Sequence, residues 1–124
     1  MHTTKTFREE NPYTLLSIMQ ENAFATLITT DEKGRPVASQ LPFLIKQKGD
    51  DIILAAHFAK ANPQWKHLES NAEVLVSFQG PHCYISPSWY EKAGVPTWDY
   101  VTVQAYGSVN VLIIPKKQGN SLRI

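Results

Sequence analysis

Residues 24–45 have the sequence FATLITTDEKGRPVASQLPFLI. The first part, Phe24–Thr30, is rich in β-branched and aromatic residues, which are typical of strands. Asp31–Gly34 is a turn signal, because glycine adopts positive φ angles at little steric cost. The second part, Pro36–Ile45, returns to strand composition. The stretch therefore predicts a β-hairpin.

The second arm of this hairpin has one face of mixed polarity. Every second side chain of a strand lies on the same face. One face then holds Val37, Ser39, Leu41 and Phe43, and the other holds Ala38, Gln40 and Leu44. Pro42 lacks a backbone donor, which predicts an edge strand or a bulge at this position.

Two Asn-Pro pairs are typical of helix starts, because asparagine caps a helix and proline suits its first turn. Asn11 and Pro12 precede apolar residues at helical spacing, which predicts a helix to about residue 22 within an N-terminal helical segment, 1–22. Asn62-Pro63 predicts a second short helix, after a buried-strand candidate, Ile52–Ala56, that ends at His57.

The later part of the chain adds short strands and an irregular end. The predicted elements are strands at Ala72–Gln79 and His82–Ser86 joined as a hairpin by Gly80-Pro81, a loop at Pro87–Pro96, a strand at Tyr100–Val111 and an irregular tail at 115–124. About six strands and two short helices predict one domain, 1–124, that is mainly β with short helices (α+β). A closed or partly open barrel is favoured, because closure pairs the strand edges.

Composition narrows the function classes. The formal net charge of +1 lacks the strong positive field expected of a protein that mainly grips nucleic acid. The single cysteine, Cys83, excludes an internal disulfide and is expected in a reducing compartment. No apolar run has signal-peptide or membrane-spanning length, so we expect a cytoplasmic protein without membrane contact.

The stretch His57–Trp65 predicts an anion site. A strand leads into a tight loop with a cation, Lys60, and a helix begins at Asn62, so exposed amides and the positive end of the helix dipole meet there. These features suit the terminal phosphate of a ligand. The alternative interpretation is that Asn62 only caps the helix, Lys60 is solvated and His57 ends a strand.

The remaining patterns concern aromatic and polar residues that allow two interpretations, and metal, thiol and hydrolase sites that the sequence does not favour. Aromatic residues such as Trp65 and Trp98 suit stacking on a planar heterocycle or ordinary packing, and Ser39 and Gln40 suit ring recognition or solvent contact. Histidine spacing predicts no metal site. We expect Cys83 to be a small buried thiol rather than a nucleophile. No P-loop, GxGxxG or GxSxG element is present, which excludes classical nucleotide and serine hydrolases.

Six segments together resemble one family, the FMN-binding negative transcriptional regulators of the PaiB-like type. They are ATL at 25–27, LP at 41–42, His57 with KANPQW at 60–65, GPH at 80–82, YISPSWY at 84–90 and VPTW at 95–98. The resemblance extends from about Thr6 to Val109. It implies a split β-barrel like that of pyridoxamine phosphate oxidases, and a homodimer that holds FMN in grooves between the subunits.

The resemblance also implies roles for individual residues. His57, Lys60 and Asn62 are expected at the phosphate, Ser39, Gln40 and Leu41 along the ribityl chain or ring, and Trp65 and Trp98 at the ring pocket or the dimer contact. Two features depart from the family: Asp99 stands where asparagine is common, and the chain looks C-terminally shortened.

The implied function is negative transcriptional regulation, with DNA or a transcriptional partner as the target. The sequence itself contains no helix-turn-helix pattern and no basic stripe. The alternative is a flavin-dependent oxidoreductase of the pyridoxamine phosphate oxidase or flavin reductase type, since flavin chemistry belongs largely to the cofactor. Haem binding through His57 or His82 is a third possibility that the spacing does not favour.

Overall fold

The computed structural model describes residues 1–70, 73–89, 91–113 and 120–123. After a short 3₁₀ turn at Lys5–Phe7, helix α1 spans Pro12–Glu21. The Asn11 side chain caps this helix by accepting hydrogen bonds from the backbone N–H groups of Tyr13 (2.9 Å) and Thr14 (3.4 Å). The predicted helix start is therefore confirmed, and its cause is local capping.

The predicted hairpin is also confirmed. Strands β1 (Phe24–Thr30) and β2 (Pro36–Pro42) pair antiparallel, and Gly34 in their turn has φ 81°. β2 is the outermost strand of a sheet with the order β2-β1-β5-β6, so the prediction of an edge strand from Pro42 is confirmed. Burial alternates along β2 with the predicted period, since Ser39 is half-buried and Gln40 is exposed.

The chain changes sheets at Phe43, earlier than the predicted strand end at Ile45. Phe43 is buried, and its backbone N–H donates to the Ala23 carbonyl (2.8 Å) rather than continuing the β2 ladder. Strands β3 (Leu44–Lys48) and β4 (Asp51–Phe58) then form a second hairpin, with Gly49 at φ 62° in the turn. They belong to another antiparallel sheet, with the order β3-β4-β8-β7.

The predicted hairpin around Gly80-Pro81 is wrong. Val74–Ile85 is one continuous strand, β5, and β6 (Thr97–Gly107) pairs with it along its length. The register shifts between Gln79 and His82, so a bulge accommodates the proline that a regular ladder excludes. A Cβ on Gly80 would lie 3.2 Å from Val101 Cβ, so glycine also permits the close approach of the two strands.

The end of the chain also differs from the prediction. β7 (Asn110–Ile113) continues from β6 into the second sheet, and Asn120–Arg123 forms β8, which pairs with both β4 and β7. The irregular tail predicted for 115–124 is therefore wrong for Asn120–Arg123, which lies between two partner strands. Residues 114–119 and 124 lie outside the described residues.

The prediction of a mainly β chain with short helices is confirmed. The described residues form eight strands rather than about six, in two four-stranded antiparallel sheets. Between these sheets the described residues record no strand pairing, so a closed barrel is not found.

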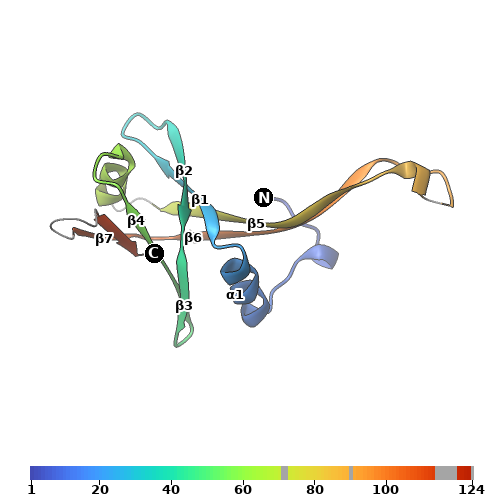
Figure 1. Cartoon of the computed structure of the whole chain (residues 1–124), viewed down its shortest axis with the longest axis horizontal. Helices are drawn as coiled ribbons and strands as arrows, with labels where there is room; N and C mark the ends of the chain where they lie inside the picture. Colours follow the sequence, from blue (N-terminus) through green and yellow to red (C-terminus); the bar gives the residue numbers. More distant parts are fainter. Residues whose placement is uncertain (71–72, 90, 114–119, 124) are drawn as a thin grey trace.

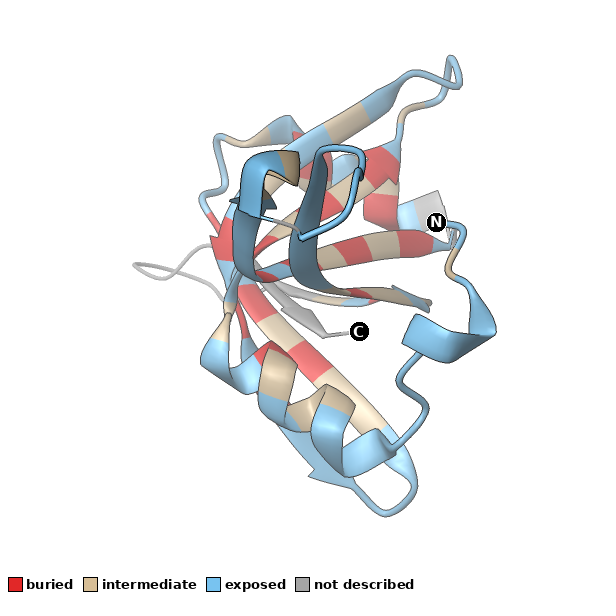
Figure 2. Cartoon of the chain, turned by 90° about the vertical axis from the view of Figure 1, so that its right-hand side faces the viewer, coloured by how far each residue is buried: buried red, intermediate tan, exposed pale blue. Residues whose placement is uncertain are grey.

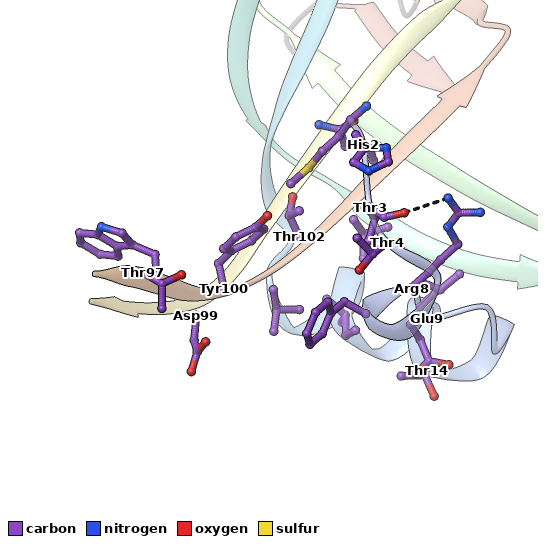
Figure 3. Close-up of a pocket in the computed structure, with 18 of the residues that line it drawn as sticks. His2, Thr3, Thr4, Arg8, Glu9, Thr14, Thr97, Asp99, Tyr100 and Thr102 are labelled. Atoms are coloured by element: carbon purple, nitrogen blue, oxygen red, sulfur yellow. Dashed lines mark hydrogen bonds between the residues drawn. The ribbon is translucent and has the colours of Figure 1, made fainter. Parts of the chain in front are cut away.

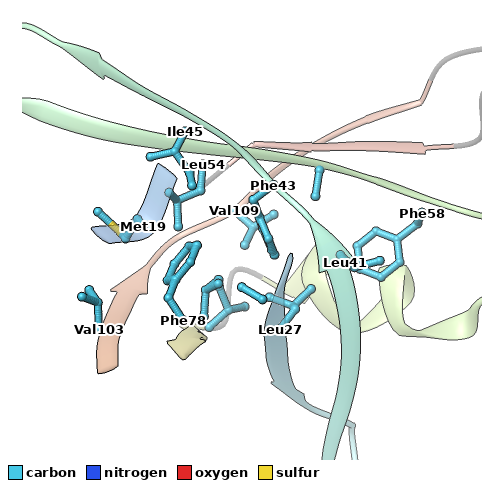
Figure 4. Close-up of a cluster of buried hydrophobic side chains, with 14 of the residues drawn as sticks. Met19, Leu27, Leu41, Phe43, Ile45, Leu54, Phe58, Phe78, Val103 and Val109 are labelled. Atoms are coloured by element: carbon cyan, nitrogen blue, oxygen red, sulfur yellow. The ribbon is translucent and has the colours of Figure 1, made fainter. Parts of the chain in front are cut away.

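One hydrophobic core joins the two sheets and helix α1 (Figure 4). Phe78 and Leu27 from the first sheet are fully buried, Ile45 and Leu54 come from the second, and Met19 comes from α1. The Phe43 and Phe78 rings lie 6.0 Å apart at an angle of 58°. The core therefore includes the residue at which the chain changes sheets.

The outer parts of β5 and β6, His82–Ile85 and Thr97–Tyr100, form a long two-stranded arm. Figure 1 shows this arm in gold and orange, extending along the longest axis away from the sheets. In the view of Figure 2 it points toward the reader and is coloured mainly as exposed.

Candidate functional site

The loop after β4 forms a tight turn around Lys60. The Asn62 backbone N–H donates to the Ala59 carbonyl (2.9 Å), which closes a β-turn with Lys60 and Ala61 at its centre. Among the described residues, no backbone hydrogen bond is recorded for the N–H of either central residue. His57, at the end of β4, and Lys60 are both exposed. The turn thus carries a cation and two available amide donors.

Asn62 connects this turn to strand β2. Its Nδ2 donates to Ser39 Oγ (3.3 Å), and its Oδ1 accepts the backbone N–H of Gln64 (3.0 Å), at the start of the 3₁₀ helix η2 (Pro63–Ser70). The predicted helix start at Asn62-Pro63 is therefore confirmed. Capping and a polar contact with β2 occur together, so the two interpretations of Asn62 do not exclude each other.

Trp65 closes the other side of the turn. Its indole Nε1 donates to the Lys60 carbonyl (3.0 Å), and its ring is half-buried. Lys66 Nζ lies 5.8 Å from the centre of the Trp65 ring, within the range of a cation–π contact. Lys66 is a second cation beside the turn that the sequence analysis missed, although its place after the KANPQW segment was a signal for it.

The β2 residues differ in how they relate to this turn. Ser39 is half-buried and in contact with Asn62, and Leu41 is buried in the core on the same face of β2. Gln40 is exposed, and by strand alternation its side chain lies on the opposite face. Within one chain, the structure therefore brings Ser39 to the turn but not Gln40.

Trp98 lies far from the turn. It is on the arm, 56% exposed, with its ring 5.7 Å from Tyr84 and 6.2 Å from His82. Figure 1 shows the arm and the yellow-green helix η2 at opposite ends of the longest axis. Five of the eight predicted site residues thus lie at or beside the turn: His57, Lys60, Asn62, Ser39 and Trp65. Leu41 is buried in the core, Gln40 is on the opposite face of β2, and Trp98 is on the arm.

A groove of about 860 Å³ runs beside β6, where the N-terminal segment lies along it (Figure 3). Arg8 and Thr3 line one side and are joined by a 3.1 Å hydrogen bond from Arg8 Nη2 to the Thr3 carbonyl. Trp98, Asp99 and Tyr100 line the other side. The groove therefore lies against the arm rather than at the Lys60 turn, and it contains Asp99, the residue that departs from the family pattern.

Further observations concern other kinds of site. Cys83 is exposed on the arm, so the prediction of a buried thiol is wrong; strand pairing places it opposite Asp99 in a ribbon with no core beneath it. In the described part of the chain, no three His, Cys, Asp or Glu side chains come together as a metal site would require. No helix in that part is long and apolar enough to cross a bilayer.

The residues around the turn fit a phosphate by their chemistry. A phosphate is recognised by cationic side chains and by backbone N–H donors. The turn offers Lys60, two central amides and the Asn62 side chain, and the neighbouring strand β2 adds the Ser39 hydroxyl. No acidic residue is among these groups.

The chain is similar to known proteins over more than half of its length. The chain is 45% identical over 112 residues to "Protease synthase and sporulation protein PAI 2" of Bacillus subtilis, covering 90% of this chain and 54% of that protein. It is 35% identical over 81 residues to "Uncharacterized protein YKL070W" of Saccharomyces cerevisiae, covering 60% of this chain and 48% of the relative. The chain thus spans about half the length of these curated relatives.

A family match covers nearly the whole chain. Residues 1–123 match the family described as "Putative FMN-binding domain". The PaiB-like resemblance predicted from the sequence segments is thereby confirmed. The chain belongs to this FMN-binding domain family.

Proposed function

We propose that this chain binds FMN, with the phosphate at the Lys60 turn, and acts in negative regulation of transcription. One observation carries the binding proposal: the turn with a cation and two available amides lies in the KANPQW segment, inside the region matched by the FMN-binding family. The regulatory role rests on likeness to a relative whose name refers to protease synthesis and sporulation.

The chain's own residues divide the work of holding the cofactor. Lys60 and the amides of Lys60 and Ala61 meet the phosphate, and Asn62 and Ser39 orient the turn and offer polar groups toward the ribityl chain. Trp65 provides an aromatic wall beside the turn. When bound, FMN supplies electron-transfer chemistry that side chains do not provide.

A flavin titration tests the binding proposal. Purified protein is mixed with FMN, and the visible spectrum and flavin fluorescence are recorded. We expect saturable binding of FMN that weakens as salt rises, because a phosphate contact with a solvent-exposed lysine is screened. A folded protein that binds no flavin would refute the proposal. Haem absorbance in the purified protein would favour the third possibility instead.

The regulatory role is tested separately. We expect the FMN-loaded protein to lower transcription from a target promoter, with DNA or a transcription factor as the partner. Turnover of NAD(P)H by the loaded protein, without any effect on transcription, would support the oxidoreductase alternative and overturn the regulatory proposal.

We also propose that the partner of this chain is a second copy. Cross-strand pairs place His82 opposite Tyr100 and Tyr84 opposite Trp98, so these four rings lie on one face of the arm. Tyr84, Trp98 and Tyr100 are 43–57% exposed. An isolated two-stranded ribbon is marginally stable in water, so burying this aromatic face against another subunit would stabilise it.

The mass in solution tests this dimer. We expect the wild-type protein to sediment as a dimer, and Trp98→Ser to shift the equilibrium toward monomer. Trp89→Ser is the matched control, since Trp89 is 67% exposed but lies outside the paired strands of the arm. A monomeric wild-type protein, or equal loss of dimer in both variants, would refute the arm as the interface.

A further inference from the structure

Gln64 is a fully buried polar residue directly behind the Lys60 turn. Its side chain is 0% exposed. Its Nε2 donates to the Leu27 carbonyl (3.3 Å) and to Thr29 Oγ1 (3.0 Å) on β1, and to the Val37 carbonyl (3.1 Å) on β2. One amide group therefore contacts both strands of the first hairpin.

The same residue holds the turn through its backbone. The Gln64 N–H donates to Asn62 Oδ1, and this bond orients the Asn62 amide so that its Nδ2 faces Ser39 Oγ. The Asn62 backbone N–H also donates to the Ala59 carbonyl, and this bond closes the Lys60 turn. The chain of contacts runs from the β1–β2 hairpin through Gln64 to Asn62 and then to the turn that carries Lys60.

Glutamine at this position has a cost as well as a benefit. Its Oε1 is buried and has no hydrogen-bond partner among the described residues. A buried carbonyl oxygen without a partner destabilises the folded state, whereas an apolar side chain of similar size would avoid that penalty. Packing alone therefore does not account for glutamine here. Its specific contribution is one amide nitrogen whose two N–H groups face three acceptors, on β1 and on β2. These contacts determine where η2 begins relative to the two strands.

We propose that Gln64 is the positioning residue of the phosphate turn and determines the preference for a flavin that ends in phosphate. This inference rests on the proposed FMN binding. Gln64 acts through Asn62 and the Lys60 turn, and it does not touch the ligand. Losing its contacts lets the turn shift relative to β2, which weakens recognition of the phosphate more than recognition of the ring.

The test compares Gln64→Met with wild type, since methionine keeps a long unbranched side chain but cannot donate. Affinities for FMN and for riboflavin, which lacks the phosphate, are measured by flavin fluorescence. We expect the FMN-to-riboflavin affinity ratio to fall by about tenfold, the size of one lost charge-assisted contact. A variant that only destabilises the fold would lower both affinities without changing their ratio.

A second readout needs no flavin. The Trp65 indole N–H donates to the Lys60 carbonyl, so its NMR signal reports the geometry of the turn. The signal is assigned by its loss in Trp65→Phe. We expect Gln64→Met to shift it and to speed its exchange with water.

Gln20→Met is the matched control, because Gln20 also donates its amide to a backbone carbonyl, that of Ile45 (3.1 Å), but ties α1 to β3. We expect it to leave both the affinity ratio and the Trp65 signal unchanged. If Gln64→Met is unfolded, Thr29→Val replaces it, since this near-isosteric change removes the one side-chain partner of Gln64 Nε2. We expect Thr29→Val to change the affinity ratio and the Trp65 signal in the same direction as Gln64→Met, but by a smaller amount.

The outcomes separate two kinds of failure. If wild type binds neither flavin, the proposed function fails, and the Trp65 signal alone decides whether Gln64 positions the turn. If wild type prefers FMN and a folded Gln64 or Thr29 variant keeps both the ratio and the Trp65 signal, the positioning role is overturned. A Gln20→Met effect equal to that of Gln64→Met would also overturn it.

Discussion

Replacing Lys60 with alanine tests the phosphate turn most directly. The Lys60 side chain is exposed, so its interaction with a bound phosphate acts through a high-dielectric medium. Two unit charges about 4 Å apart in water interact by about 1 kcal/mol, and a phosphate carries a charge of about −1.5 to −2 near neutral pH. The expected loss is therefore about 1.5–2 kcal/mol of FMN binding free energy, or about 10–30-fold in Kd.

The assay measures flavin fluorescence at low salt for wild type, Lys60→Ala and Lys46→Ala. Lys46 is an exposed lysine on β3, away from the turn, and serves as the charge-matched control. We expect Lys60→Ala to weaken FMN by the stated factor and riboflavin by less than about twofold, because riboflavin has no phosphate to lose contact with. The difference should shrink as salt rises.

Two results would refute this reasoning. Equal weakening of FMN and riboflavin by Lys60→Ala would mean that the lysine acts on the ring or on the fold rather than on the phosphate. Equal effects of Lys46→Ala and Lys60→Ala would show that only net charge matters. Circular dichroism spectra of all three proteins verify that the comparison is between folded states.

Three further predictions concern stability, measured by urea unfolding. Phe78→Ala should lower the free energy of unfolding by about 3–5 kcal/mol, because Phe78 is fully buried against Phe43, whereas Phe24→Ala at a 70% exposed position should cost less than about 1 kcal/mol. Gly80→Val should cost about 1–3 kcal/mol, since a Cβ there already lies 3.2 Å from Val101 Cβ; an unchanged midpoint would contradict the close approach. Asn11→Ala should cost about 1 kcal/mol through loss of the helix cap, and Asn11→Ser should restore most of it.

Local interactions explain why some elements were predictable from sequence. The start of α1 depends on hydrogen bonds that the Asn11 side chain accepts from the backbone N–H groups two and three positions later. The first hairpin depends on Gly34 at positive φ and on alternation within β2. The turn before η2 likewise depends on contacts between neighbours, so its cation and its helix start were visible in the KANPQW segment.

Tertiary contacts explain why two predictions from sequence were wrong: the hairpin at Gly80-Pro81 and the irregular tail. β5 continues past Gly80-Pro81 because β6, about twenty residues later, pairs with both halves of it across a bulge. Asn120–Arg123 becomes a strand because it lies between β4 and β7. Neither partner is visible in the composition of the segment itself, and a segment with turn composition can be held as a strand when both edges are paired.

Some features of the candidate site could likewise be predicted from local sequence, and others depend on tertiary contacts. The residue types that suit a phosphate, and the family to which the chain belongs, follow from the sequence, because a short segment holds the cation, the turn and the helix start. Three features are visible only in the folded structure. Ser39 contacts Asn62, Gln64 is buried between β1 and β2, and Trp98 lies on the arm, far from the turn. Their contacts join residues from separate strands, and such distances are determined by sheet pairing and core packing rather than by local sequence.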